Sequence, residues 1–216
     1  LFRSQLSWVF IAICVGIALV DWCAVATDQK KLEYIAKPLT MVPLIVVAVI
    51  CTPAVPAMRW WFVAALLLSL LGDVLLMLPR EELFVAGLGS FLVAHVAYVV
   101  GLNIGGVSGL RILIGAVLAG TVLLAIGPTI VKGASERDKV LGPPVAVYMG
   151  VLGAMFVMAV GAGPVVGIVG AALFMLSDAC IGWSQFVAQF THSRLAIMIT
   201  YHVAQILLVV SMTVTR

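Results

Sequence analysis

The sequence contains few charged residues. Only 10% of its 216 residues are Asp, Glu, Lys or Arg, whereas 64% are hydrophobic. An ordinary soluble domain carries about 25% charged residues, so this chain has too little polar surface to cover a water-exposed globule. The scarcity of charge excludes a soluble fold and indicates that lipid surrounds most of the chain.

The sequence also lacks basic clusters and cysteine motifs. Its net charge is only +3, and its 12 Lys and Arg residues fall in short segments between apolar runs. Nucleic-acid binding requires a concentrated basic stripe, so we exclude nucleic acid as a partner. The cysteines lie singly in apolar runs without metal-ligand or disulfide spacing, so we expect packing roles for Cys14, Cys23, Cys51 and Cys180.

Apolar runs of about 20 residues, the length that crosses a bilayer as a helix, fill most of the chain. The first run resembles a signal peptide, but Asp21 and Trp22 interrupt it and many similar runs follow, so we interpret it as a span. We predict an all-α membrane protein with a single polytopic domain over residues 1–216. Its eight transmembrane helices are expected at Leu6–Thr27, Pro38–Met58, Trp60–Leu78, Leu83–Asn103, Leu110–Val131, Val140–Val160, Pro164–Phe186 and Arg194–Val214.

The loop charges predict an orientation for these spans. An even number of spans places both termini on one side, where the loops and termini carry 4 basic residues against 8 on the other side. The positive-inside rule then places both termini outside. We expect Trp22 and Trp183 near the inner interface, as aromatic belts predict.

Short polar motifs recur after about half of the chain. Gly72-Asp73 is matched by Ser177-Asp178, 105 residues later, and Ala94-His95 is matched by Tyr201-His202, 107 residues later. The repeat unit would contain four helices, and an even number keeps both halves in the same direction. We therefore predict two parallel four-helix repeats, approximately residues 1–105 and 106–216.

A few polar residues lie inside the expected spans, where an ionisable group costs about 3 kcal/mol or more and usually marks function. All fall in the inner half of the bilayer, so we expect one pocket that opens inward. Its members are Lys37, Asp73, His95, Tyr148, Asp178 and His202. We place Asp21 outside this site, at the interface, and interpret Arg80 to Glu82 as a solvated loop, from which Glu82 could reach the pocket mouth.

Each of these residues also has a structural interpretation. The two Asp residues could simply pair with a Lys or with helix hydroxyls, and the two His residues could be satisfied by interhelical hydrogen bonds. Tyr148 could only pack, and Lys37 could extend to the lipid headgroups.

Several motifs together resemble the YhhN-like lysoplasmalogenase family over nearly the whole chain. They are Lys37-Pro38-Leu39-Thr40, Ser69-Leu70-Leu71-Gly72-Asp73, Gly87-Leu88-Gly89-Ser90-Phe91 leading to Ala94-His95, Leu176-Ser177-Asp178, and Tyr201-His202. The resemblance implies a multi-pass enzyme of the bacterial cytoplasmic membrane. Its implied substrate is a lysoplasmalogen, whose vinyl ether bond it hydrolyses to a fatty aldehyde and a glycerophospho-ethanolamine or glycerophospho-choline.

Vinyl ether hydrolysis requires a proton donor, a nearby anion and an activated water. Two carboxyls in a pocket of low polarity supply them, because like charges cannot both ionise cheaply. We expect one of Asp73 and Asp178 to act as general acid and the other to stabilise the cation and accept a proton from water. Lys37 would bind the phosphate, and His95, His202 and Tyr148 would orient the carboxyls or the glycerol. No metal or other cofactor is expected.

Two other functions stay open on the sequence alone. Two Asp and two His residues could bind zinc in an intramembrane lipid hydrolase, although no local His pair supports this. Parallel repeats with polar residues between them also describe small-molecule or lipid transporters.

Overall fold

The computed structural model describes residues 5–78 and 81–214, apart from the side chains of Glu81 and Glu82. The described chain folds into helices joined by short connections. Each of the eight is long and apolar enough to cross a membrane, which confirms the predicted all-α membrane fold. The helices are α1 (Gln5–Ala26), α2 (Lys30–Ile50), α3 (Met58–Met77), α4 (Glu81–Ile104), α5 (Gly109–Arg137), α6 (Gly142–Ala162), α7 (Val165–Phe186) and α8 (Ser193–Ser211).

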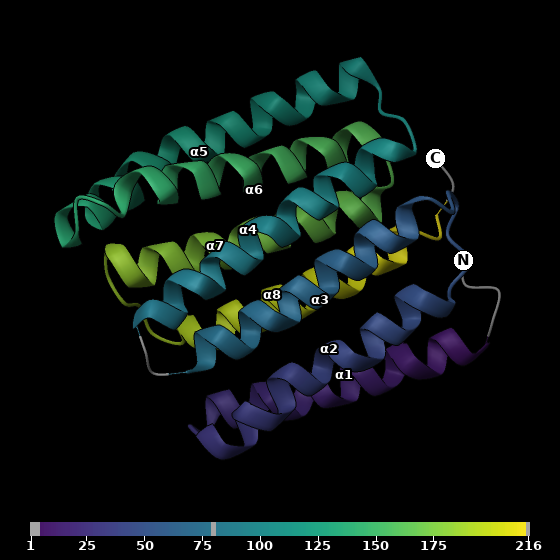
Figure 1. The fold of residues 1–216 in the computed structure, drawn as a ribbon, viewed down its shortest axis with the longest axis horizontal. Coiled ribbons are helices and arrows are strands. Elements are labelled where there is room, and N and C mark those ends of the chain that lie inside the picture. The colour runs from purple at the N-terminus through teal and green to yellow at the C-terminus, as the bar shows by residue number, and fades with distance from the viewer. Residues whose placement is uncertain (1–4, 79–80, 215–216) are drawn as a thin grey trace.

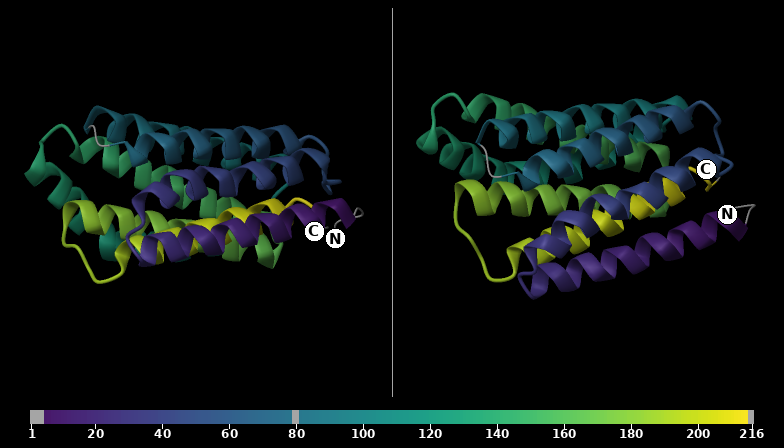
Figure 2. Two further views of the ribbon diagram at one scale, coloured as in Figure 1. Left: turned by 90° about the horizontal axis from the view of Figure 1, so that it is seen from below. Right: turned by 60° about the horizontal axis from the view of Figure 1, so that its bottom comes forward.

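The helices run up and down in a single bundle, with both termini at one end (Figure 1). The α1–α2 pair forms one edge of the bundle and the α5–α6 pair forms the other. Figure 2 shows the α3–α4 and α7–α8 pairs on opposite sides of the centre, where α4 also packs on α6 and α8 also packs on α1 and α2. We call the end of the bundle away from the termini the distal end.

Two helices differ from their predicted bounds by more than three residues. Helix α2 begins at Lys30, two turns before Pro38, and ends at Ile50, while α5 continues past Val131 to Arg137. In both places charged residues suggested a loop. The charged residues of α2 instead occupy helical turns beside a cavity, and those of α5 occupy helical turns in solvent. On α5, Lys132 and Glu136 form an exposed i, i+4 pair at 3.7 Å. The Arg80 to Glu82 loop falls partly outside the described residues, and α4 already begins at Glu81.

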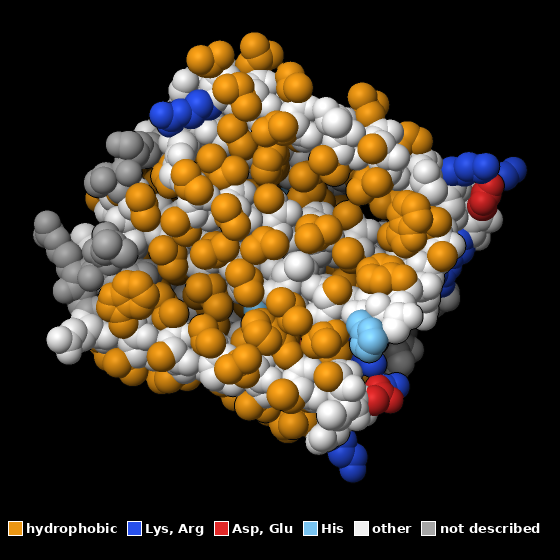
Figure 3. Space-filling view, turned by 180° about the vertical axis from the view of Figure 1, so that it is seen from behind, with side chains coloured by type: hydrophobic (Ala, Val, Ile, Leu, Met, Phe, Trp, Pro, Cys, Tyr) orange, Lys and Arg blue, Asp and Glu red, His pale blue; other side chains and the backbone are white. Residues whose placement is uncertain are grey.

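Aromatic rings fill the centre of the bundle. Phe174 on α7 packs edge to face against four rings: those of Phe91, His95 and Tyr98 on α4, and that of Tyr201 on α8. Large apolar side chains also cover the outside, as expected for a surface that contacts lipid. Figure 3 shows this apolar face, with the charged side chains gathered toward the ends of the helices.

The basic residues of the described chain favour the distal end. Lys30, Lys31, Lys132, Arg137, Lys139 and Arg194 lie in or beside the connections there, and Lys37 lies two turns into α2. Arg59 and Arg111 lie at the other end. Three further basic residues in the orientation argument fall outside the description: Arg3, Arg80 and Arg216. The common side of the two termini is confirmed, and their placement outside the cell stays a prediction.

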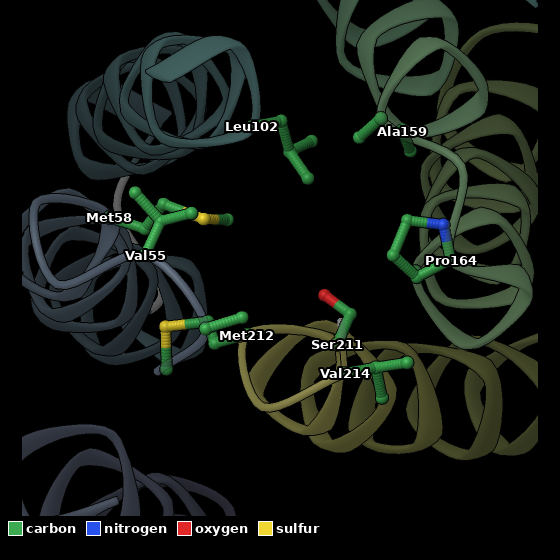
Figure 4. A pocket seen from close by; sticks show the side chains of 11 residues that line it. Val55, Met58, Leu102, Ala159, Pro164, Ser211, Met212 and Val214 are labelled. Atoms are coloured by element: carbon green, nitrogen blue, oxygen red, sulfur yellow. The ribbon is translucent and has the colours of Figure 1, made fainter. Parts of the chain in front are cut away.

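A small cavity lies at the end that carries both termini. It measures about 10 Å³ and is lined mainly by apolar residues, including Met58, Leu102, Pro164 and Met212 (Figure 4). Such a volume holds about one water molecule. A lipid-sized ligand must therefore bind elsewhere.

Candidate active site

Asp73 forms a buried ion pair near the distal end of α3. Its Oδ1 atom lies 3.2 Å from Lys37 Nζ, and the Tyr201 hydroxyl donates a hydrogen bond of 2.6 Å to Oδ2. The side chains of Asp73 and Lys37 are only 2% and 8% exposed. Lys37 therefore does not extend to the headgroups but points inward from the second turn of α2, and a nearby cation stabilises the ionised form of Asp73.

Asp178 has different neighbours at a similar depth on α7. Tyr148 on α6 donates a short hydrogen bond to Oδ2, and His95 Nε2 lies 3.6 Å from the same oxygen, which is too long for a hydrogen bond. No Lys or Arg of the described chain pairs with this side chain, which is 6% exposed. Asp178 is thus the member of the pair without a cation.

The contacts of the two Asp residues follow a crosswise pattern. Asp73 pairs with Lys37 on the preceding helix and with Tyr201 on α8, while Asp178 contacts Tyr148 on the preceding helix and His95 on α4. Each Asp thus contacts a residue of the recurring His motif in the other half of the chain, which is Tyr201 for Asp73 and His95 for Asp178. Two duplicated four-helix units would produce this pattern, and the duplication itself stays a prediction.

Two adjoining cavities occupy the distal half of the bundle. A polar cavity of about 500 Å³ is lined by charged and amide side chains from α2, α7 and α8, including Lys30, Glu33, Lys37, Gln185 and Arg194. An apolar cavity of about 380 Å³ lies between α4, α6 and α7, and its walls include Leu88, Leu92, Val145, Met149, Tyr148 and Asp178. Leu76, Phe84 and Ile181 line both cavities. The pair of cavities therefore suits a molecule with a charged head and one apolar chain.

His202 lies apart from both carboxyl pairs. It faces α1, where the Trp22 indole N–H donates a hydrogen bond of 3.0 Å to His202 Nδ1 and the two rings stack. Asp21 is fully buried beside it, with Oδ2 4.0 Å from Nδ1. Asp21 is therefore not an exposed interfacial residue, because its face of α1 packs on α2 and α8, while the interfacial position of Trp22 stays a prediction.

Sequence reasoning missed Tyr201 and Asp21 as members of this region. Tyr201 belongs to the recurring Tyr201-His202 motif. From that motif we selected only the histidine as a site residue. Asp21 interrupts an apolar run, which was the same signal that singled out Asp73 and Asp178. Its nearness to the end of the span made an interfacial position the simpler interpretation.

The zinc alternative does not fit the residues in place. Within residues 5–78 and 81–214, no three His, Cys, Asp or Glu side chains come together in an arrangement that could hold a metal ion. His95 packs in the aromatic core and His202 turns toward α1. The two histidines therefore do not converge with the two aspartates on one point.

A family sequence model covers most of this architecture. The model of the YhhN family matches residues 32–212, which include every helix that contributes to the two carboxyl pairs. The chain belongs to the YhhN family. This assignment confirms the resemblance seen in the motifs.

Curated relatives of this YhhN-family chain include named enzymes. It is 37% identical to lysoplasmalogenase TMEM86B of Homo sapiens over 150 residues. The matched segment covers 68% of this chain and 61% of the human protein. The rat protein of the same name is 34% identical over 70% of this chain and 61% of its own length. The uncharacterized membrane protein YhhN of Escherichia coli is 33% identical over 43% of each chain. The matches thus span less than two thirds of these relatives, and no solved structure matches the chain.

Gly72 sets the approach of α3 and α4 beside Asp73. A Cβ atom there would lie 2.6 Å from the Phe91 ring and 3.2 Å from the Gly87 carbonyl oxygen. We expect Gly72→Ala to destabilise the protein by about 1–3 kcal/mol, as overpacking does, and to lower activity because Phe91 packs on Tyr201. Thermal unfolding in detergent measures the effect. Gly120→Ala, where a Cβ meets nothing within 4 Å, should cause no loss, and equal losses would contradict this packing role.

Proposed function

We propose that this protein hydrolyses the vinyl ether bond of lysoplasmalogens, releasing a fatty aldehyde and a glycerophospho-ethanolamine or glycerophospho-choline. The observation that carries the proposal is the position of Asp178 in the wall of an apolar cavity that adjoins a polar cavity containing Lys37. The printed name of the human and rat relatives supports the same activity.

The two cavities bind different parts of the substrate. The phosphate enters the polar cavity, where Lys37 offers an ammonium group and Lys30 and Arg194 add positive charge. The alkenyl chain lies in the apolar cavity, where burial of each CH₂ group contributes about 0.8 kcal/mol. The vinyl ether then lies near Leu76, Phe84 and Ile181, which line both cavities.

The two Asp residues have different neighbours, and this difference indicates which of them is the general acid. Asp178 has no cation among the described residues, so burial favours its neutral, protonated form. Tyr148 holds Oδ2, which leaves Oδ1 to carry the proton. Asp73 is paired with Lys37 and accepts from Tyr201, so it stays ionised. Asp178 is therefore the general acid, and Asp73 supplies negative charge.

The reaction then needs no group beyond these residues and water. Asp178 protonates the outer alkenyl carbon, which breaks the C=C π bond and leaves an oxocarbenium ion stabilised by the carboxylate now present on Asp178 and by the charge of Asp73. Water attacks the cationic carbon and loses a proton to Asp178, which restores the acid. The resulting hemiacetal collapses to aldehyde and a glycerol hydroxyl as the hydroxyl proton moves to the departing oxygen.

The remaining site residues orient these groups. His95, which lies on α4, limits the rotation of the Asp178 side chain, and Tyr148 holds its Oδ2 atom.

We place the protein in the bacterial cytoplasmic membrane with the distal end inside. In this orientation, which follows the excess of basic residues at that end, lysolipid enters the polar cavity from the inner leaflet.

Product analysis tests the proposed function. Purified protein in detergent, given a lysoplasmalogen, should release free aldehyde and the water-soluble glycerophosphodiester, while a lysolipid with a saturated ether at the same position should stay intact. A transporter would leave the vinyl ether intact and move it between liposome leaflets. Such movement without aldehyde would contradict the hydrolase proposal.

Blocking the apolar cavity should impair turnover. Leu88 lines this cavity, so Leu88→Trp fills space that the alkenyl chain occupies, and we expect kcat/KM to fall about tenfold or more for a long-chain substrate, with each excluded CH₂ contributing about 0.8 kcal/mol. A short-chain substrate should be less affected. Leu118→Trp, at a half-exposed position on α5, serves as the matched control. Equal kinetics in the two variants would place the chain elsewhere.

A further inference from the structure

Asp21 is a buried carboxyl group without a hydrogen-bond partner. Its side chain is fully buried on α1, and neither of its oxygens forms a hydrogen bond within the described chain. A buried polar group without a partner costs about 1–3 kcal/mol, and a charged one costs more. An apolar residue would suit this position better, so the carboxyl group contributes something other than packing.

His202 does not provide the missing partner. Its Nδ1 atom is 4.0 Å from Asp21 Oδ2, but it already accepts the indole hydrogen of Trp22. An indole N–H can only donate, so Nδ1 carries no proton to give to Asp21. The proton of the neutral ring therefore sits on Nε2, which also lacks a partner within the described chain.

The buried cation on the neighbouring helix is Lys37. Helix α1 packs on α2, and Lys37 is the one Lys or Arg of the described chain that is buried. Its ammonium group has three donors, and one is directed at Asp73 at 3.2 Å. Lys37 also lines the polar cavity, and no direct ion pair within 4.0 Å joins it to Asp21.

We propose that Asp21 is a third acidic residue of this site, which holds the Lys37 ammonium group from α1 through a bound water. A buried water needs two to four polar partners, and the Asp21 carboxyl, a Lys37 N–H and the His202 Nε2–H supply them. Two carboxyl groups thus hold one flexible lysine, while its third donor stays directed at the polar cavity. Asp21 is a positioning residue, and its effect on catalysis rests on the proposed function.

A double-mutant cycle tests whether Asp21 acts through Lys37. We expect Asp21→Asn to lower kcat/KM by about ten- to a hundredfold, the range that a small misplacement of a binding group can cause. In a Lys37→Met background, the same substitution should have little further effect. Asp138→Asn, in the exposed connection between α5 and α6, should behave like the unaltered protein. Equal losses in both backgrounds would overturn the proposal, since a merely structural role would act in each.

A second readout does not depend on the reaction. The thermal midpoints of the two single variants and of the double variant in detergent form the same cycle, and we expect their shifts not to add, because coupled groups are non-additive. Additive shifts would overturn the link between Asp21 and Lys37. If the unaltered protein releases no aldehyde, the proposed function fails, whereas non-additive midpoints would still support the three-residue cluster.

Discussion

Asp178→Asn should reduce aldehyde release by about 10²- to 10⁴-fold, the range that general acid catalysis contributes. The amide has nearly the shape of the carboxyl group and can still accept the hydrogen bond from Tyr148, but it cannot protonate carbon. Initial rates with a saturating lysoplasmalogen measure the loss in kcat. Because the substitution leaves both cavities in place, we expect substrate binding to persist.

The matched control for this variant is Asp138→Asn. Asp138 lies in the exposed connection between α5 and α6, where its Oδ1 accepts the Val140 N–H, and an amide oxygen can accept the same bond. It should retain full activity. A kcat for Asp178→Asn within a fewfold of that control would contradict the assignment of Asp178 as the acid.

Lys37→Met should strongly destabilise the protein and lower its turnover. Removal of one partner of a buried ion pair costs about 3–5 kcal/mol, because it leaves the other charge buried and unpaired. The Asp73 side chain, 2% exposed, would be left in that state. We expect a lower thermal midpoint in detergent, and turnover should fall because the polar cavity loses the cation that binds the phosphate.

The double variant Lys37→Met/Asp73→Asn separates the two effects. It removes both charges, so most of the lost stability should return, while activity should stay low. Lys132→Met breaks an exposed pair whose side chains are 77% and 68% exposed and should change stability by less than about 1 kcal/mol. If the double variant were as unstable as Lys37→Met, the ion pair would not explain the loss.

The membrane fold and the central pair of acids were accessible from the sequence because their signals are local. Eight apolar runs of bilayer length define the helices, and an Asp inside such a run is costly enough to mark function. The structure confirms the helices and brings Lys37 to Asp73, and Tyr148 and His95 to Asp178. Their catalytic roles stay proposals.

Other features depend on helix rotation and packing, which a single sequence does not fix. The sequence places His202 at the right depth, but only the packing of α8 on α1 turns its ring toward Trp22. Asp21 lies near the end of a span, where an acid can reach water, and its burial results from the contact of α1 with α2 and α8. The start of α2 at Lys30 was hidden because its charged first turns line a cavity.

The separate surroundings of the two acids give the site its proposed chemistry. Asp73 has a cation and a hydroxyl donor, whereas Asp178 has a hydroxyl donor and lies in an apolar wall. Pairs of titratable groups in such different environments commonly divide acid and anion roles. The sequence shows that two acids are present, and the structure shows how their surroundings differ.

The most direct test of this account is the reaction of purified protein with a lysoplasmalogen in D₂O, followed by mass analysis of the aldehyde. Protonation of the outer alkenyl carbon by Asp178, whose acidic hydrogen exchanges with solvent, predicts one deuterium on the carbon next to the carbonyl group. The same label should be absent from aldehyde formed in H₂O, and Asp178→Asn should release almost no aldehyde. Aldehyde without deuterium, or no aldehyde from folded protein, would contradict the account.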